Sequence, residues 1–518
     1  DATDDAAVQR LRARKHRPDR PLAVLFPSVE QLLEHARPSR EELAALEGPE
    51  APIVLVASGP SLLAPSVAPR VPHLGAMLPA SALHGLLASS ALRPLVCTSG
   101  NPTSEPMCID VDEARTRLGG VADAFVHHDR PIARSVDDSV VSVREGSRSV
   151  SVLRRARGFA PTPIRLARSS PTVLAVGAQL KSTACLVVDG EAVLSQHVGD
   201  LASVASALLL ERTVDDLLRF HRRSPDVIAC DAHPDYASTE LAERLARAHG
   251  VPLVRVQHHR AHVASCLAEH GIDDDVVGFA WDGLGLGDDG TPWGGEAFCG
   301  PLGALRRTVT LRAFPLIGGD RASREPRRSA VGLLLAAGLP LDPHLATPEE
   351  ARVFTSMVAR SVQSSPTSSI GRLFDAVAAL LGVRTTCTFE GQAAMELEAL
   401  AGDVDAPPYP IAVTDGVADW EPMLRALLAD RAADAPPARI AARFHETLAE
   451  LAERIAVASG RPFAVLSGGC FQNRRLAASV QRRLETRGLR VLHHERVPTN
   501  DGGIALGQAA LALRTLSA

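Results

Sequence analysis

The chain has 518 residues, enough for two to four domains, and its 46% hydrophobic and 22% charged residues are typical of a globular protein. Its formal net charge is −5, and no part of the sequence is basic enough for a nucleic-acid surface, so we expect no nucleic-acid partner. No apolar run reaches the ~18 residues of a membrane span, so no membrane partner is expected either. The eight cysteines are scattered, without a Cys-x-x-Cys pair, which favours reduced thiols in a cytoplasmic protein.

The first third of the chain has an α/β pattern. Residues 1–17 predict a helix, and apolar runs predict strands at 22–26, 53–57, 94–97 and 122–126. Lys15 and Arg17 precede the first strand, where they could bind an anion or form a solvated helix end. Ser99 and Asn101 follow the third strand, in a turn that suits either an anion cradle or an Asx turn.

Arginine is concentrated towards the end of this region. Seven arginines lie between Arg144 and Arg168, with only Glu145 to offset them. Guanidinium groups pair well with phosphate oxygens, so this density suits a polyphosphate better than a purely structural role.

Residues 167–171, Ala-Arg-Ser-Ser-Pro, mark the predicted boundary between a domain at 1–168 and a second at 172–518. Strands are then expected at 173–176, 184–188 and 191–196, with Gly177 and Lys181 in the first connection. Asp189-Gly190 predicts a tight hairpin turn. A hairpin that presents backbone N–H groups, a lysine and hydroxyls is how the actin and sugar-kinase architecture holds nucleotide phosphates.

A candidate metal site begins after a short strand at 252–256. The spacing that follows predicts a helix with His258 and His262 on one face, one turn apart. Two such imidazoles can hold a divalent metal ion, although a polar helix surface explains them as well. Asp282 ends an apolar strand before a predicted glycine turn, and Asp501 lies in an Asn-Asp-Gly-Gly segment near the C-terminus. We expect these four side chains to converge on one cation.

Two later segments carry further polar groups. Helices at 371–378 and 389–398 are expected to direct polar residues, among them Asp375, at a cleft. Ser467-Gly468-Gly469 follows a strand at 463–466 and leads through Asn473 into a helix, where backbone N–H groups can contact phosphate.

Taken together, these segments resemble the HypF carbamoyltransferases of NiFe-hydrogenase maturation over nearly the whole chain. The resemblance implies an α/β protein in which residues 1–168 form a YrdC-like domain without its first strand. Residues 172–518 would form a Kae1-like domain, a two-lobed fold of the ASKHA (actin and sugar-kinase) type. In the family, the first domain makes carbamoyl-adenylate from ATP and carbamate, and the second passes the carbamoyl group to the C-terminal cysteine of the partner HypE.

The resemblance also implies cofactors and roles. It implies ATP and a divalent metal, for which mixed nitrogen and oxygen ligands suit iron or zinc better than magnesium. Catalytic roles fall on Lys15, Arg17 and Lys181. The remaining nucleotide contacts would be Ser99, Asn101, Arg134, Arg155 and Arg157 in the first site, and Gly177, Asp375, Gly468, Gly469 and Asn473 in the second. The metal ligands would be His258, His262, Asp282 and Asp501.

Three departures from the family pattern keep alternatives open. The family's acylphosphatase-like and zinc-finger regions are absent from these residues, so we expect an upstream segment. Residues 79–84 read Pro-Ala-Ser-Ala-Leu-His in place of Pro-Tyr-Thr-Pro-Leu-His, and Arg260 replaces a frequent histidine. The alternatives are an O-carbamoyltransferase acting on a small-molecule hydroxyl, a tRNA-threonylcarbamoylating enzyme, and an inactive scaffold for maturation proteins.

Overall fold

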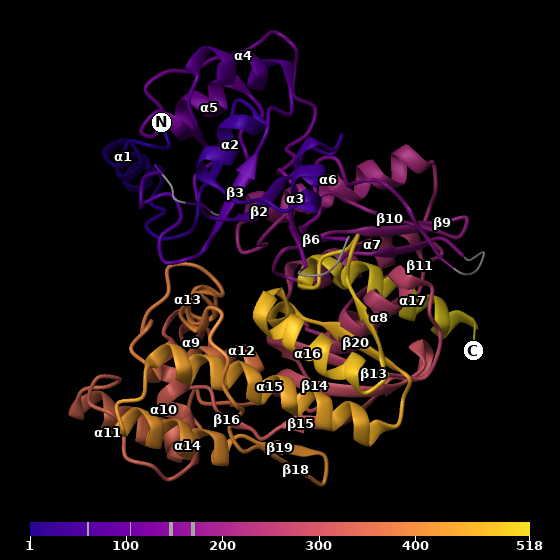
Figure 1. The fold of residues 1–518 in the computed structure, drawn as a ribbon. Helices are drawn as coiled ribbons and strands as arrows, with labels where there is room; N and C mark the ends of the chain where they lie inside the picture. The colour runs from indigo at the N-terminus through magenta and orange to yellow at the C-terminus, as the bar shows by residue number, and fades with distance from the viewer. Residues whose placement is uncertain (60–61, 104, 145–148, 167–170, 518) are drawn as a thin grey trace. The chain divides into compact units, whose positions relative to one another are not determined.

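The computed structural model describes residues 1–59, 62–103, 105–144, 149–166 and 171–517. The chain divides into two compact units (Figure 1). Unit 1 contains Asp1–Arg255 and Glu495–Leu513, and unit 2 contains Val256–His494 and Arg514–Ala518. The predicted domain boundary at 167–171 falls mostly on residues 167–170, which lie outside the described residues.

The first sheet of unit 1 is mixed, with the strand order β4-β1-β3-β2-β5-β6. Its strands are β1 (Ala23–Leu25), β2 (Ile53–Ala57), β3 (His73–Met77), β4 (Leu95–Cys97), β5 (Val140–Val143) and β6 (Val150–Arg154). The associated helices are α1 (Asp5–Lys15), α2 (Val29–His35), α3 (Arg40–Glu47), α4 (Ala82–Ala91) and α5 (Val111–Leu118). Alternate residues of β2, Val54 and Val56, are buried in the core with Val24 of β1, as expected for a strand with one covered face.

The second sheet of unit 1 has the order β12-β11-β8-β9-β10-β7. Its strands are β7 (Ile164–Arg165), β8 (Val173–Ala175), β9 (Cys185–Val188), β10 (Glu191–Leu194), β11 (Val227–Asp231) and β12 (Leu253–Val256). The helices are α6 (Val204–His221), α7 (Ala237–His249), and the C-terminal η3 (Asp501–Gly503) and α17 (Ile504–Ser517). Strands β9 and β10 form the predicted hairpin, and both Asp189 and Gly190 have positive φ, as a tight turn requires.

Unit 2 is built on a seven-stranded sheet with the order β18-β19-β15-β14-β13-β20-β21. Its strands are β13 (Val276–Leu286), β14 (Pro292–Gly300), β15 (Arg306–Leu311), β18 (Ala412–Thr414), β19 (Val417–Asp419), β20 (Phe463–Ser467) and β21 (Arg490–His493). A separate two-stranded sheet contains β16 (Phe314–Pro315) and β17 (Pro366–Thr367). Parallel pairing of β13 with β20 places Ser467, the last residue of β20, beside Ala280 in the middle of β13.

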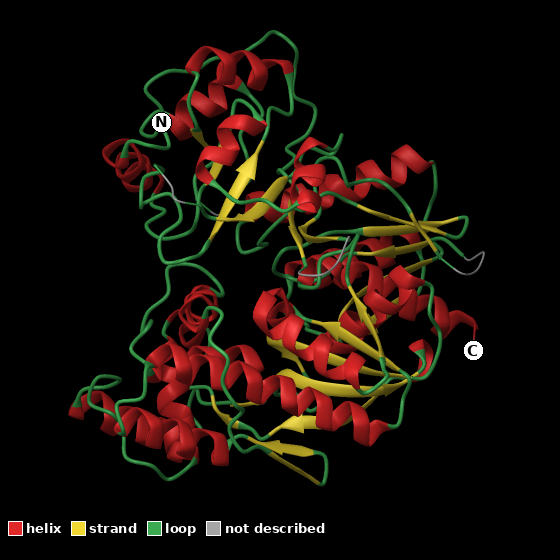
Figure 2. Cartoon of the chain, viewed as in Figure 1, coloured by secondary structure: helices red, strands yellow, loops and turns green. Residues whose placement is uncertain are grey.

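Helices surround this sheet (Figure 2). They are α8 (His258–His270), α9 (Arg321–Arg324), α10 (Pro326–Ala336), α11 (Pro348–Ala359), α12 (Ile370–Leu380), α13 (Gln392–Ala401), α14 (Glu421–Ala432), α15 (Pro437–Ser459) and α16 (Arg474–Thr486), with short turns η1 (Leu302–Ala304) and η2 (Gly469–Gln472). The side chains of Phe279, Trp281, Phe374 and Phe444 are buried in one continuous core between sheet and helices. This packing holds α12 and α15 against β13, which carries the candidate site.

One predicted strand is wrong. Residues 122–126 form no strand, and Val126 is 75% exposed. Apolar residues alone cannot make a strand without a pairing partner, and none of the sheets in the described part of the chain includes this segment. The described residues contain no helix that is long and apolar enough to cross a membrane.

Candidate active site and metal centre

Three of the four predicted metal ligands meet within unit 2. His258 and His262 lie in the first two turns of α8, whose N-terminus is capped by the side chain of Gln257. Both imidazoles are buried, and their Nε2 atoms lie 3.5 and 3.4 Å from Oδ2 of Asp282. Their ligand atoms are within 4.8 Å of one another, and this set of two imidazole nitrogens and a carboxylate oxygen suits a divalent metal ion.

Asp282 is not at the end of its strand, which corrects the predicted glycine turn. Strand β13 continues to Leu286, with a shift in its pairing with β14 between Trp281 and Gly285. The irregular register re-aims side chains here, as bulges do next to functional sites. Gly283 and Gly285 therefore lie in a bulged strand and do not form a phosphate-binding turn. The absence of a side chain at Gly285 leaves space for the imidazoles of His258 and His259.

The Asp282 carboxylate is also fixed from the strand beside it. The backbone N–H of Gly469 donates to Asp282 Oδ1 at 3.0 Å, and a Cβ at Gly468 would lie 2.2 Å from the carbonyl oxygen of Trp281. Burial opposes ionisation of Asp282, but hydrogen bonds from His258 and His262 outweigh it and hold the pKa of this carboxyl well below its usual range. The predicted Ser-Gly-Gly segment thus closes around a metal-type carboxylate.

Helix α12 carries a buried ion pair next to this group. Arg372 Nη1 lies 2.8 Å from Asp375 Oδ2, and both side chains are buried. Burial raises the pKa of Asp375 to about 6, against the opposing effect of Arg372. Asp375 is among the residues predicted from the sequence, whereas Arg372, one helical turn away, is not.

Asn473 is held by partners in the chain. Its Oδ1 accepts the N–H of Leu476 and caps α16, and its Nδ2 lies 2.9 Å from Nε2 of buried His445. Burial lowers the pKa of His445 to about 4. A neutral imidazole that donates from Nδ1 to the carbonyl of Ala441 can accept from Asn473, which fixes the orientation of the amide.

A buried glutamate that the sequence analysis missed lies behind the histidines. Glu296 Oε2 accepts the N–H groups of Gly294 and Gly295, each at 2.7 Å, and Oε1 accepts from Ser368 Oγ. Burial nevertheless raises the pKa of Glu296 to about 7. Its Oε2 lies 3.9 Å from Nε2 of His259, so the sequence signal that could have identified it is the Gly-Gly-Glu run opposite the histidines.

In unit 1, the predicted Gly177–Thr183 turn is joined to the C-terminal segment. The N–H and carbonyl of Gly177 pair with the side chain of Gln508 at 2.9 and 3.0 Å. Thr183 Oγ1 donates to the carbonyl of Gly502, the residue after buried Asp501. Lys181 lies in this turn with a φ of 47°. Hydrogen bonds therefore join the predicted phosphate turn to the C-terminal segment that contains Asp501.

Three residues predicted for the first nucleotide site also contact one another. Lys15 Nζ donates to the carbonyls of Ser99 and Asn101 at 2.7 and 3.1 Å, and Ser99 Oγ lies 2.6 Å from Asn101 Oδ1. Burial lowers the pKa of Lys15 to about 8, with a smaller contribution from the charge of Arg17.

Arg17 lies in a cluster of positive charge. Burial, together with smaller contributions from the charges of Arg20, Arg12 and Arg154, lowers its pKa to about 10. Arg20 is not among the residues predicted from the sequence, and Arg154 is predicted only as part of the arginine-rich run. Such a concentration of guanidinium groups favours binding of an anion.

The other three arginines predicted for this site have protein partners. Arg134 Nε donates to Asp216 on α6 at 2.9 Å. Arg157 donates to Asp138 Oδ1 and to the carbonyls of residues 50 and 51. Arg155 donates to the carbonyls of Thr162 and Arg496. Their assignment to the nucleotide stays a prediction.

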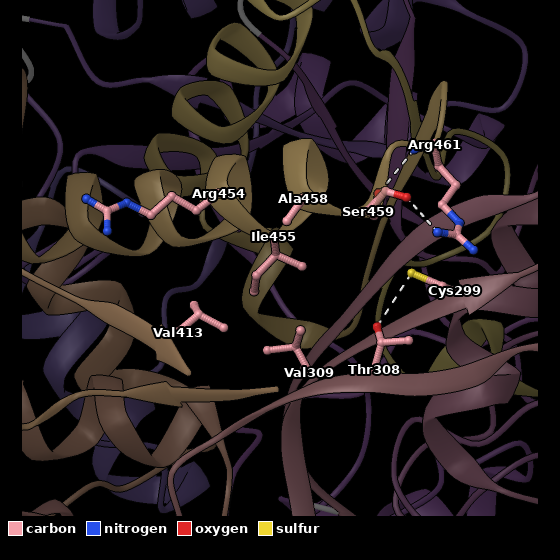
Figure 3. Close-up of a pocket in the computed structure, with 9 residues that line it drawn as sticks. All are labelled: Cys299, Thr308, Val309, Val413, Arg454, Ile455, Ala458, Ser459 and Arg461. Carbon is pink, nitrogen blue, oxygen red and sulfur yellow. Dashed lines mark hydrogen bonds between the residues drawn. The ribbon is translucent and has the colours of Figure 1, made fainter. Parts of the chain in front are cut away.

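A cavity of about 500 Å³ in unit 2 contains none of the predicted site residues (Figure 3). Its walls include Cys299, which accepts a hydrogen bond from Thr308, and the apolar side chain of Ile455. Its two arginines already have partners, since Arg454 donates to the carbonyl of Ile411 and Arg461 to Asp275.

Comparison with known proteins agrees with the geometry. Family models match residues 1–156 (the Sua5, YciO and YrdC family, described as telomere recombination), 168–269 (HypF Kae1-like domain) and 278–508 (carbamoyltransferase, Kae1-like domain, second subdomain). The chain is 42% identical to carbamoyltransferase HypF2 of Cupriavidus necator, over 99% of this chain and 70% of that protein. It is also 42% identical to carbamoyltransferase HypF of Rhodobacter capsulatus, over 100% of this chain and 70% of that protein. The chain belongs to the HypF carbamoyltransferase family.

Solved HypF structures have the same fold. Full-length HypF in its phosphate- and nucleotide-bound form matches with a TM-score of 0.95 at 38% identity, over 100% of this chain and 82% of that one. HypF of T. kodakarensis matches with a TM-score of 0.93 at 32% identity, over 100% of this chain and 71% of that one. The expected fold class, an α/β chain with a YrdC-like part followed by a Kae1-like part of ASKHA type, is confirmed, and the protein is a carbamoyltransferase.

Proposed function

We propose that this protein forms carbamoyl-adenylate from ATP and carbamate, which derives from carbamoyl phosphate, and transfers the carbamoyl group to the C-terminal cysteine of a HypE-like protein in hydrogenase maturation. The observation that carries the proposal is the buried group of His258, His262 and Asp282 in a member of the HypF family. We assign adenylate formation to residues 1–168 and transfer to residues 172–518. We expect the protein to act in the cytoplasm, without nucleic-acid or membrane partners.

In the first step, a carbamate oxygen attacks the α-phosphorus of ATP. A new P–O bond forms, and the bond to the β-phosphate oxygen breaks, so pyrophosphate leaves with the electron pair. Lys15 and Arg17, with Ser99 and Asn101 beside them, are the groups we assign to the triphosphate, because a fixed positive charge stabilises the charge that develops there. Arg134, Arg155 and Arg157 extend this proposed nucleotide site.

In the second site, His258, His262 and Asp282 would hold the metal ion, and Asp501 is the fourth ligand we assign to it. Asp501 is buried and offers a carboxylate oxygen. The next residue, Gly502, accepts the hydrogen bond from Thr183 at the end of the Gly177–Thr183 turn. When bound, a divalent ion here would supply Lewis-acid polarisation, and the donor set suits iron or zinc better than magnesium. Lys181, with Gly177, Asp375, Gly468, Gly469 and Asn473, would orient the adenylate.

In the transfer step, the acceptor sulfur attacks the carbamoyl carbon of the adenylate. A C–S bond forms, the C–O bond to AMP breaks, and AMP leaves with that electron pair while the thiol proton passes to water.

Two assays test this function. Carbamate-dependent exchange of labelled pyrophosphate into ATP measures adenylate formation, and labelled carbamoyl on a purified acceptor measures transfer. We expect both activities, with a HypE-like protein as acceptor. Absence of exchange would contradict the enzyme proposal, and transfer to a small-molecule hydroxyl in place of the thiol would identify an O-carbamoyltransferase.

A further inference from the structure

Arg372 lies directly beside the strand that carries Asp282. Ser369 caps α12 by accepting the N–H of Arg372, and its own Oγ lies 2.9 Å from the carbonyl oxygen of Asp282. A Cβ at Gly371 would lie 2.9 Å from both that oxygen and Cα of Gly283. The first turn of α12 is thus packed on the backbone of the metal-type ligand, and the position of Arg372 relative to it is fixed.

The guanidinium group is buried in this position. The Arg372 side chain is 8% exposed, and Nη2 would lie 3.7 Å from a Cβ placed on Gly283. The thiol of Cys470 is near this group: burial raises its pKa well above the usual range, and the charges of Asp282, Arg372 and Asp375 all act on it. Arg372 is therefore a buried cation whose ion-pair partner is the carboxylate of Asp375.

This guanidinium lacks part of its hydrogen bonding. Among the residues that the structure describes, its buried Nε and Nη1 have no hydrogen-bond acceptor, and Asp375 Oδ2 has no donor, although Nη1 and Oδ2 are 2.8 Å apart. The two groups are close but not aligned for a hydrogen bond. A buried unsatisfied donor costs about 1–3 kcal/mol, so native proteins rarely keep one without a ligand or a functional reason.

We propose that Arg372 is a substrate-binding residue that donates hydrogen bonds to the phosphate oxygens of the adenylate in the transfer site. The forked guanidinium matches phosphate geometry, and its charge would stabilise the electron pair that AMP takes as the carbamoyl C–O bond breaks. Asp375 then orients the guanidinium through their ion pair. This inference rests on the proposed function, because it needs a carbamoyl-adenylate intermediate.

The test compares Arg372→Gln and Arg372→Lys with Arg328→Gln in the full chain. Arg328 of α10 is a matched control, since its side chain is also 8% exposed and pairs with Glu325, the residue just before that helix. Exchange, transfer, metal content and melting temperature are measured for each variant. We expect Arg372→Gln to lower transfer about 100-fold while exchange and metal content stay within about twofold, and Arg372→Lys to restore about tenfold.

The outcomes separate the two proposals. Wild-type protein without exchange would contradict the proposed function itself. If the wild-type protein is active, three results would overturn the role of Arg372. They are normal transfer in Arg372→Gln, a loss of transfer in Arg328→Gln as large as in Arg372→Gln, and a loss of bound metal that accompanies the loss of transfer in Arg372→Gln. If Arg372→Gln does not fold, Arg372→Lys decides: transfer reduced about tenfold at unchanged exchange supports the proposal, and unchanged transfer overturns it.

Discussion

Gly285 of β13 lies against the imidazole of His258, so closely that a Cβ at residue 285 would be 2.5 Å from His258 Cδ2 and 2.7 Å from His259 Cε1. Real Cβ atoms do not approach other atoms this closely. The missing side chain therefore allows α8 to pack tightly on β13, which brings the two histidines of the helix within reach of Asp282.

The first prediction concerns this close approach. Gly285→Ala should lower the free energy of unfolding by about 1–3 kcal/mol, because the added methyl group forces α8 away from β13. It should also weaken metal binding about tenfold, since His258 moves while Asp282 stays with its strand. Urea unfolding and titration with zinc measure the two effects separately.

Gly85→Ala is the control for this change. A Cβ at Gly85 in helix α4 would meet nothing within 4 Å, so that variant should keep its metal affinity and gain up to about 1 kcal/mol of stability from the better helix former. Normal zinc affinity in Gly285→Ala would show that the site does not depend on this spacing.

The second prediction is that His262→Ala abolishes transfer, by about 1,000-fold or more, while carbamate-dependent pyrophosphate exchange remains. The reason is that the proposed ligands all lie beyond residue 171, whereas the groups assigned to adenylate formation lie before it. His270→Ala serves as control, because His270 ends the same helix and its Nε2 contacts the carbonyl of His493. Equal loss of exchange and transfer in His262→Ala would mean that the sites are misassigned.

Much of this arrangement could be predicted from the sequence because its signals are local. The spacing of His258 and His262 is a property of one helix, and the Asp189-Gly190 hairpin is a property of one turn. The predicted bounds of β2, residues 53–57, agree with the structure for the same reason.

What the sequence did not reveal depends on tertiary contacts. The segment 122–126 has the composition of a strand but no partner to pair with, and β13 runs through Asp282 because β14 continues to pair with it. Arg372 has no local signal at all, since its importance comes from the packing of α12 on Gly283. Sequence periodicity reports which face of an element is buried, but not which element covers it.

The third prediction concerns stability and pH. The pKa of Glu296 is about 7 in the folded protein, above its ordinary value of 4.5, mainly because of burial. The folded state therefore holds the proton more tightly, and the stability gained at low pH is lost as pH rises from about 4.5 to about 7. Relative to Glu296→Gln, the wild-type free energy of unfolding should fall by about 3 kcal/mol across this window. Urea unfolding at several pH values measures it, and parallel curves for the two proteins would contradict the prediction.

The fourth prediction concerns Lys15 and adenylate formation. Burial lowers the pKa of this ammonium group to about 8, so a growing fraction of the free enzyme loses the charge as pH rises above that value. If this charge binds the triphosphate, kcat/KM for pyrophosphate exchange should fall about tenfold per pH unit above pH 8.

Lys15→Arg provides the comparison, because a guanidinium keeps its charge throughout this range. That variant should lose activity at neutral pH, since the planar group cannot reproduce the contacts of Nζ with the carbonyls of Ser99 and Asn101. Its remaining activity should nevertheless show no decline between pH 8 and pH 9.5. The same decline in both proteins would mean that another group titrates, and that the charge of Lys15 does not control the first step.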